Sequence, residues 1–403
     1  MTPGPPFVVV GASLAGLRAV EGARAAGYGG PITLIGAESH LPYDRPPLSK
    51  AFLQSDAPVP VLRDEAFLRD ELGVDLLLGA PAERLDPDAD IVWVDGKPVP
   101  FGTLVIATGA TPRIPPTWAS IPGVTTLREL DDAHALRAAL EKKARTVIVG
   151  AGFIGSEVAS AARHRGCEVT VVEAEPAPLA RAVGAEMAPA LAAIHLRNGT
   201  DLRLSATVAA VHGSGQVEAV ELADGSLLPA DLVVVGIGAT PTTGWLAGSG
   251  VALNAHDHGI LCNSYLATSR PGVYAAGDVA HWPNAIMDQG LTRLENWTNA
   301  AAQGGAAARN ALQPGLQEPY ETVPYVWSDW YDTRVQLVGH PSSDEARIVS
   351  GGMNGPRLVV LYRSGERLAG AFTLNEPAKI MKYRRLIHRR GTWQEALDLF
   401  SPR

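Results

Sequence analysis

The glycine-rich stretch TVIVGAGFIGSEV, from Thr146 to Val158, has residues whose types and spacing suit phosphate binding. Gly150, Gly152 and Gly155 form the pattern G-x-G-x-x-G directly after a short apolar run. In such a turn the first glycine permits the tight bend, the second lets the backbone approach a pyrophosphate, and the third lets helix and strand pack closely. Glu173 follows 23 residues after Gly150, where an acid accepts hydrogen bonds from ribose hydroxyls. The stretch therefore predicts a dinucleotide site.

An earlier stretch, VVVGASLAGLRA from Val8 to Ala19, repeats this pattern with one departure. Gly11 and Gly16 occupy the first and third positions, but Ser13 replaces the middle glycine. Serine is small enough for a phosphate still to approach, and Glu38 supplies an acid 27 residues after Gly11. One match is weak because an ordinary strand–helix turn can produce it, but two in the same context favour two nucleotide sites. A flavin in the first and a nicotinamide in the second would let one dinucleotide reduce the other.

Residues 7–38 and 146–175 are the segments that must position these turns. Each is a short apolar run, a glycine turn, an alanine-rich helical stretch and a β-branched run that leads to an acid. This order is typical of strand–helix–strand units with a parallel sheet. The expected fold class is therefore α/β, with two Rossmann-like dinucleotide-binding domains.

The composition limits the remaining possibilities. The chain has 403 residues, which fits two or three domains, and its net charge of −8 argues against general binding to nucleic acid or an anionic membrane. Cys167 and Cys262 lie far apart and no metal-ligand spacing occurs, so we expect neither a disulfide framework nor a metal site. No basic segment precedes the first apolar run, and no apolar stretch reaches the roughly 18 residues of a membrane span. We expect a cytoplasmic protein.

Five further stretches resemble a known family. LVIATGATPR (Leu104 to Arg113) and RPGVYAAGDVA (Arg270 to Ala280) resemble motifs of the FAD-dependent pyridine-nucleotide oxidoreductases. LPYDRPPLSK (Leu41 to Lys50), ENWTNAAAQG (Glu295 to Gly304) and VPYVWSDWYDTRVQLVG (Val323 to Gly339) resemble the ferredoxin reductases of bacterial oxygenase systems, of the putidaredoxin-reductase and biphenyl-dioxygenase-reductase type. Rubredoxin reductases and apoptosis-inducing-factor-like proteins share many of these motifs, so both stay open as alternatives.

The resemblance and the repeat imply a discontinuous, glutathione-reductase-like organisation. An FAD-binding domain would take residues 1–110 and 240–318, an NAD-binding domain residues 111–239, and a small α+β C-terminal domain residues 319–403. In this last part RVQLVG, RLVVLYR and RLAGAFTL alternate as a small antiparallel sheet would, and KIMKYRRLIHRR indicates a helix.

The resemblance also implies hydride transfer from NADH to FAD, followed by two single-electron exits. Lys50 would lie beside the flavin and Glu157 beside the nicotinamide as an ion pair; the alternative is a surface lysine and a glutamate that complements the helix dipole. Trp297 and Trp327 would cover the flavin unless they are ordinary core residues, and Arg113 would contact the cofactor unless it is a plain surface charge. The implied FAD-binding residues are Gly11, Ser13, Leu14, Ala15, Gly16, Glu38, Arg45, Pro46, Lys50, Ala82, Thr108, Gly109, Arg113, Asp278 (at the ribityl chain), Trp297 and Trp327. The implied NAD-binding residues are Gly150, Gly152, Phe153, Ile154, Gly155, Glu157, Glu173 and Gly238.

Two acids favour NADH over NADPH. Glu173 would repel a 2′-phosphate, and Glu175 would strengthen that repulsion. Arg181 is the residue that could favour NADPH, unless it is only a solvated surface charge. We expect NADH.

The partner is expected to be an iron–sulfur protein. Neither Cys167 nor Cys262 lies where relatives carry a redox dithiol or a single reactive cysteine, so electrons are expected to leave the flavin directly. A ferredoxin, most simply of the two-iron type, fits a one-electron acceptor. Residues 379–390 hold six basic residues and no acid, which could steer an acidic partner, although a solvated helix face is the alternative. The candidate docking residues are Lys379, Lys382, Arg384 and Arg385.

Overall fold

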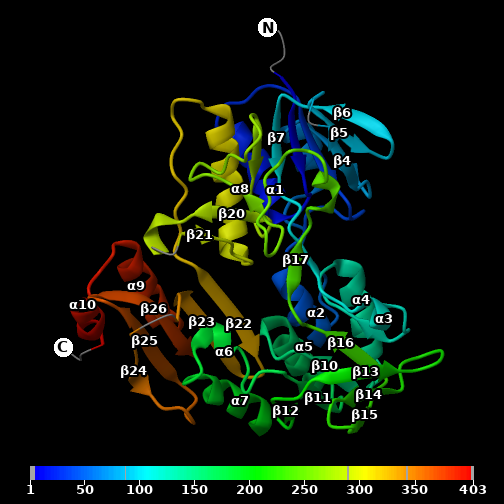
Figure 1. The fold of residues 1–403 in the computed structure, drawn as a ribbon, viewed down its shortest axis with the longest axis vertical. Coiled ribbons are helices and arrows are strands. Elements are labelled where there is room, and N and C mark those ends of the chain that lie inside the picture. Colours follow the sequence, from blue (N-terminus) through cyan, green and yellow to red (C-terminus); the bar gives the residue numbers. More distant parts are fainter. Residues whose placement is uncertain (1–4, 87, 288–289, 342–343, 401–403) are drawn as a thin grey trace. The chain divides into compact units, whose positions relative to one another are not determined.

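The structure is a computed structural model that describes residues 5–86, 88–287, 290–341 and 344–400, and its internal contacts divide the chain into two units (Figure 1). The first unit consists of residues 5–44, 60–111 and 240–324. The second consists of residues 45–59, 112–239 and 325–400.

The first unit is built on a five-stranded parallel sheet in the order β19-β7-β1-β2-β3. Its strands are β19 (Val273–Ala275), β7 (Thr103–Ile106), β1 (Phe7–Val10), β2 (Ile32–Gly36) and β3 (Val74–Leu78). All four residues of β1 are buried, as expected of a central parallel strand covered on both faces. Two three-stranded sheets complete the unit: β4 (Ala82–Asp86), β5 (Ile91–Val94) and β6 (Lys97–Pro100), and β18 (Ile260–Leu261), β20 (Ala280–Pro283) and β21 (Leu291–Thr292).

Two long helices of this unit, α1 (Leu14–Ala25) and α8 (Trp297–Leu312), lie side by side (Figure 1). They approach until backbone meets backbone, because a Cβ at Gly304 would lie 2.0 Å from the Ala15 carbonyl oxygen and one at Gly22 would lie 2.8 Å from the Gly305 Cα. The glycine pair in AAAQGGAAA thus fixes how α8 packs on the helix that follows the first glycine turn.

The second unit holds a second five-stranded parallel sheet, in the order β12-β11-β10-β16-β9. These strands are β12 (Asp201–Arg203), β11 (Val169–Val172), β10 (Thr146–Val149), β16 (Leu232–Val235) and β9 (Val124–Thr125). Beside it are the antiparallel strands β13 (Val208–His212), β14 (Ala219–Leu222) and β15 (Leu227–Pro229), and the helices α2 (Ala51–Gln54), α3 (Pro116–Ala119), α4 (Leu130–Glu141), α5 (Phe153–His164), α6 (Ala180–Val183) and α7 (Ala188–Arg197). Strands β8 (Ala110–Pro112) and β17 (Ala239–Pro241) pair where the chain passes from one unit to the other.

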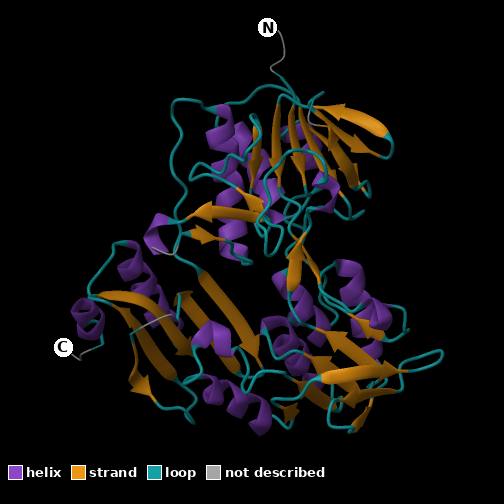
Figure 2. Cartoon of the chain, in the orientation of Figure 1, coloured by secondary structure: helices purple, strands orange, loops and turns teal. Residues whose placement is uncertain are grey.

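The C-terminal part of the second unit is a five-stranded antiparallel sheet in the order β22-β23-β26-β25-β24. Its strands are β22 (Tyr325–Trp330), β23 (Thr333–Gly339), β24 (Glu345–Gly351), β25 (Leu358–Ser364) and β26 (Arg367–Leu374). Helix α9 (Pro377–His388) packs on β23 and β26, and α10 (Trp393–Asp398) follows it (Figure 2). The three predicted strands and the predicted helix are confirmed, and β22 and β24 extend the sheet on both sides.

The α/β fold class with two dinucleotide-type sheets is confirmed by this topology. The division into three domains stays a prediction; in the structure, residues 45–59 and 325–400 group with residues 112–239. Among the described residues, no helix has both the length and the apolar character needed to cross a membrane.

Candidate active site

The first glycine turn joins β1 to α1 and leaves no space for side chains at its two outer glycines. Gly11 has a φ of 118°, and a Cβ there would lie 2.1 Å from the Ala107 carbonyl oxygen. A Cβ at Gly16 would lie 1.9 Å from the Gly11 carbonyl oxygen. Ser13 is the N-cap residue of α1, so the middle position of the pattern lies at the positive end of the helix dipole, where a phosphate binds favourably. The turn fits a dinucleotide.

Other predicted flavin residues of the first unit follow the carboxyl ends of the strands of its parallel sheet. Leu14 and Ala15 open α1 and are buried, and Ala82 is the first residue of β4. The Tyr43 hydroxyl donates to Glu38 Oε2 at 2.5 Å, so the acid of the first repeat is oriented by a phenol. Thr108 and Gly109 follow β7, and the Thr108 hydroxyl donates to the Thr242 carbonyl oxygen at 2.8 Å.

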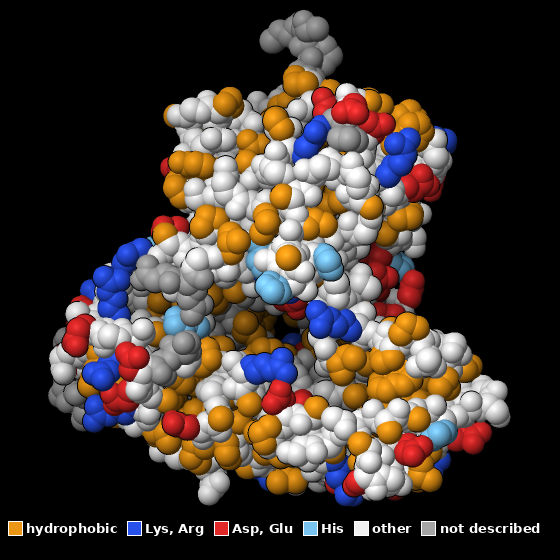
Figure 3. Space-filling model, viewed as in Figure 1, with side chains coloured by type: hydrophobic (Ala, Val, Ile, Leu, Met, Phe, Trp, Pro, Cys, Tyr) orange, Lys and Arg blue, Asp and Glu red, His pale blue; other side chains and the backbone are white. Residues whose placement is uncertain are grey.

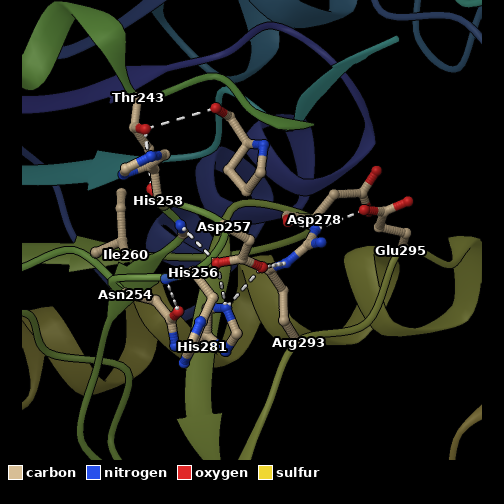
Figure 4. A network of polar contacts seen from close by, with 12 residues as sticks. Thr243, Asn254, His256, Asp257, His258, Ile260, Asp278, His281, Arg293 and Glu295 are labelled. Atoms are coloured by element: carbon tan, nitrogen blue, oxygen red, sulfur yellow. Dashed lines mark hydrogen bonds and ion pairs between the residues drawn. The ribbon is translucent and has the colours of Figure 1, made fainter. Parts of the chain in front are cut away.

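A polar network in the same unit holds the backbone at Asp278, the acid predicted to reach the ribityl chain (Figure 4). Arg293 Nη1 donates to the Asp278 carbonyl oxygen at 2.9 Å, and Arg293 Nε lies 2.7 Å from Asp257 Oδ2. His281 Nε2 lies 2.9 Å from the other Asp257 oxygen. Burial opposes ionisation of Asp257, but hydrogen bonds from Gly259, His281 and Arg293 outweigh it and lower the pKa of this carboxyl to about 2. The network therefore keeps a charged anchor for Arg293 at all ordinary pH values.

Trp297 lies at the first position of α8 and is oriented by a carboxylate. Its indole Nε1 donates to Asp44 Oδ1 at 2.7 Å. The adjacent Asn296 caps the helix by accepting a hydrogen bond from the Asn299 backbone N–H. Trp297 is half-buried, so it is not an ordinary core tryptophan.

The second glycine turn joins β10 to α5 and differs at its middle position. A Cβ at Gly150 would lie 2.4 Å from the Gly236 carbonyl oxygen, and one at Gly155 would lie 2.1 Å from the Gly150 carbonyl oxygen. At Gly152 the nearest such atom is 3.9 Å away. No atom of the described residues therefore requires glycine at this position, which leaves open backbone for an approaching ligand, as the pattern predicts. Phe153 and Ile154 begin α5, and Ile154 is exposed.

The acid of the second repeat is tied to the turn itself. Glu173 Oε2 accepts a hydrogen bond of 2.7 Å from the Ala151 backbone N–H, and Oε1 accepts one of 2.9 Å from the Glu175 backbone N–H. Glu175 also forms an ion pair with Arg181. The Arg181 guanidinium is thus held by an acid, and its own pKa is raised by that hydrogen bond.

Lys50 and Glu157 form an ion pair, with 2.7 Å between Lys50 Nζ and Glu157 Oε1. The Glu157 side chain is 3% exposed and the Lys50 side chain 18%, so neither is a plain surface charge. The hydroxyls of Ser49 and Ser328 also donate to the Glu157 carboxylate. The pair lies one helical turn after the second glycine turn, and its role beside the cofactors stays a prediction.

Five of the predicted flavin residues belong to the second unit: Arg45, Pro46, Lys50, Arg113 and Trp327. Arg45 Nη1 donates to the Arg128 carbonyl oxygen at 2.6 Å, and Pro46 begins the 3₁₀ helix Pro46–Ser49 that leads to Lys50. Arg113 is exposed, and its backbone N–H donates to Gly238. The Trp327 ring stacks on that of Tyr325 at 5.7 Å between centroids.

Sequence reasoning missed several residues of these networks, among them Ser49, Ser328, Asp257 and Arg293. Ser49 and Ser328 lie inside stretches that carry the family resemblance and Arg293 lies two residues before another, whereas Asp257 lies outside all of them.

The two cysteines are buried free thiols. Burial raises the pKa of Cys262 to about 12 and also raises that of Cys167. Neither is a reactive thiolate at neutral pH.

Family models, curated relatives and a solved structure all match this chain over most of its length. The model of the family "Pyridine nucleotide-disulphide oxidoreductase" matches residues 5–304, and "Reductase C-terminal" matches residues 325–398. Rhodocoxin reductase of Rhodococcus erythropolis is 36% identical over 94% of this chain and 89% of its own length. The ferredoxin–NAD(+) reductase component of the p-cumate 2,3-dioxygenase system of Pseudomonas putida is 35% identical over 96% and 94%. The reductase in the covalent putidaredoxin reductase–putidaredoxin complex superposes with a TM-score of 0.92 at 29% identity, covering 99% and 98% of the two chains.

Proposed function

Because the chain belongs to the pyridine nucleotide-disulphide oxidoreductase family, we propose that it is an NADH-dependent reductase that passes electrons to a ferredoxin serving an oxygenase. Its cofactors are FAD and NADH. The observation that carries the proposal is the ion pair between half-buried Lys50 and buried Glu157, which follows a glycine turn with open backbone at Gly152.

The residues of the first unit would hold FAD. The turn around Gly11 and Gly16 would receive its pyrophosphate at the N-terminus of α1. Asp278, whose backbone Arg293 fixes, would accept hydrogen bonds from the ribityl hydroxyls. Once bound, FAD supplies the chemistry that a side chain cannot: it takes two electrons together from NADH and releases them one at a time.

The residues of the second unit would bind NADH and set the local charge. Gly150, Gly152 and Gly155 would receive the dinucleotide at the N-terminus of α5, and Glu173 and Glu175 would disfavour a 2′-phosphate. Lys50 is held by Glu157 in a site from which water is largely excluded. There its positive charge would favour an anionic cofactor form more strongly than in water.

The acceptor would be a ferredoxin, and the two-iron type is the finer part of this proposal. On the face in Figure 3, Lys and Arg side chains gather over α9 and α10. Lys382 and Arg385 are exposed, and no ion pair is found for either within the described part of the chain. By contrast, Lys379 pairs with Glu376 at 3.0 Å and Arg384 lies over the Tyr325 ring. Lys382 and Arg385 are therefore the better docking candidates of the four. The buried thiols Cys167 and Cys262 leave sulfur out of the route, and a cytoplasmic location fits such thiols.

An anaerobic titration tests the proposal. About one equivalent of NADH should bleach the yellow protein, and a two-iron ferredoxin added next should rapidly restore the colour while it is reduced. If a rubredoxin restores the colour and a ferredoxin does not, the acceptor is a rubredoxin and the protein is a rubredoxin reductase. A long-lived reduced complex that neither protein reoxidises would favour an NADH-sensing flavoprotein and contradict the reductase proposal.

A further inference from the structure

Glu157 is a buried carboxylate whose two oxygens are held by three donors. Lys50 Nζ lies 2.7 Å from Oε1, the Ser328 hydroxyl donates to the same oxygen, and the Ser49 hydroxyl donates to Oε2. Because the Glu157 side chain is 3% exposed, water cannot easily replace a missing donor. A buried charge is tolerated only where it is paired and hydrogen-bonded, so the hydroxyls help to fix where this carboxylate lies.

The Ser328 hydrogen bond can point in one direction only. The Trp330 indole Nε1 lies 2.7 Å from Ser328 Oγ. An indole N–H is a donor without acceptor capacity, so the Ser328 oxygen accepts from Trp330 and its own proton is left for Glu157. An ionised carboxylate only accepts, which agrees with this direction. The chain Trp330 to Ser328 to Glu157 is therefore polarised toward the carboxylate, and each bond strengthens the next.

The C-terminal hairpin brings Ser328 to this position. Strands β22 and β23 are joined by a tight turn in which Tyr331 has a φ of 53°. The Tyr331 backbone N–H donates to Ser160 Oγ at 2.6 Å, and Ser160 lies on α5, three residues after Glu157. The hairpin tip is thus hydrogen-bonded to the helix that carries Glu157, at a point that does not touch the carboxylate.

We propose that Ser328 is a positioning residue for the reaction: together with Ser49 it fixes the Glu157 carboxylate that holds Lys50. This inference rests on the proposed function, because it assigns the C-terminal sheet a part in the chemistry of the NADH-dependent step. Ser49 belongs to the segment that carries Lys50, whereas Ser328 comes from a strand 171 residues beyond Glu157.

A double-mutant cycle on the FAD-loaded full chain tests this role. The rate constant of anaerobic flavin bleaching by NADH is measured for the parent protein, Ser328→Ala, Glu157→Gln and the double variant. Ser328→Ala should slow bleaching by about tenfold with NADH affinity within about twofold, since small misplacements of reacting groups cost one to two orders of magnitude. In the Glu157→Gln background the same substitution should have almost no further effect, because residues that act through one another are not additive.

Ser160→Ala is the matched control, since it removes a hydrogen bond between the same hairpin and the same helix but leaves Glu157 untouched. It should slow bleaching by less than about twofold. A second readout is the unfolding temperature of the loaded protein, which Ser328→Ala should lower more in the parent than in the Glu157→Gln background.

Equal slowing by Ser160→Ala and Ser328→Ala, or full slowing by Ser328→Ala in the Glu157→Gln background, would show that Ser328 only supports the fold. The two proposals fail differently. A parent protein that NADH does not bleach overturns the proposed function, whereas fast bleaching in both parent and Ser328→Ala overturns only the positioning role.

Discussion

The helices α1 and α5 follow equivalent glycine turns yet bury different kinds of side chain. The buried residues of α1 are all apolar or glycine, and they pack on α8 at backbone distance. The buried residues of α5 include Ser156, Glu157 and Ser160, all of which hydrogen-bond to other segments of the second unit. Helix α1 therefore packs closely through apolar residues beside its turn, whereas α5 carries a polar network beside its turn.

This difference indicates how one supersecondary unit serves two tasks. The helix after the first turn packs on α8 at glycines, so the backbone around that turn cannot shift without a steric clash. Such a turn suits a cofactor that stays bound. A turn that leaves Gly152 open and places a buried ion pair one helical turn later suits a ligand that enters, reacts and leaves. The variants below test whether the two copies are truly specialised in this way.

The largest effect is expected where the copies are alike, at the third glycine. Gly16→Ala would place a Cβ 1.9 Å from the Gly11 carbonyl oxygen, so either the turn or the helix must shift. We expect a loss of about 3 kcal/mol of stability and loss of bound FAD. The unfolding temperature and the flavin-to-protein absorbance ratio measure these losses. Gly29→Ala is the control, because a Cβ there meets no atom of the described residues within 4 Å; equal behaviour of the two variants would contradict the packing argument.

A smaller effect is expected at Arg293, which holds the Asp278 backbone. Arg293→Ala removes the donor to the Asp278 carbonyl oxygen and leaves the Asp257 carboxylate with fewer partners. A hydrogen bond from a charged group contributes about 1.5–3 kcal/mol, so FAD affinity should fall roughly 10- to 100-fold. Fluorescence of FAD released on dilution measures the dissociation constant. Arg145→Ala, which breaks an exposed ion pair with Asp231, should leave it unchanged; an unchanged constant in Arg293→Ala would remove this network from the cofactor site.

The clearest contrast between the copies is at the middle glycine. Gly152→Ala adds a Cβ that lies 3.9 Å from the Gly236 carbonyl oxygen, so the fold and the bound FAD should be unaffected. The methyl group would instead meet the incoming dinucleotide, and we expect the KM for NADH to rise about tenfold. Steady-state kinetics with a small artificial acceptor measures this. The reverse change in the first copy, Ser13→Gly, should alter neither the KM for NADH nor the dissociation constant of FAD. A Gly152→Ala variant with an unchanged KM would contradict the assignment of Gly152 to the NADH site.

Much of the fold could be predicted from local sequence. The two strand–turn–helix units are strongly patterned, and β23 (TRVQLVG), β25 (LVVLYRS) and β26 (RLAGAFTL) are short, mostly apolar runs. Strand β22 (YVWSDW) mixes polar and apolar side chains, so its sequence does not indicate a strand, and β24 (EARIVSG) is a partly exposed edge strand with weak alternation.

The site could be predicted only in part, because its networks join residues that are distant in the sequence. Lys50 and Glu157 were indicated by the family resemblance, but Ser328 meets Glu157 across 171 residues and Arg293 meets Asp257 across 36. A single serine or arginine carries no local signal of such a contact. Glu173 shows the opposite case: its position was indicated by spacing, but its hydrogen bonds to the Ala151 and Glu175 backbone follow only from the folded turn.

The smallest effect at neutral pH is expected at His195 of the second unit, whose burial changes stability only as the pH falls. His195 lies under α5, with Nε2 3.1 Å from Ser156 Oγ and Nδ1 3.0 Å from the Tyr331 hydroxyl. Burial lowers its pKa from 6.5 to about 4, so the folded protein keeps this imidazole neutral where the unfolded chain is already protonated. As the pH falls from about 6.5 to 4, unfolding therefore becomes more favourable, by up to roughly 3 kcal/mol. The His195→Gln variant should show a flatter dependence of unfolding temperature on pH within this window. His212→Gln, which changes an exposed histidine paired with Glu221, should keep the parent's dependence; a parent-like slope in His195→Gln would mean that another group governs acid stability.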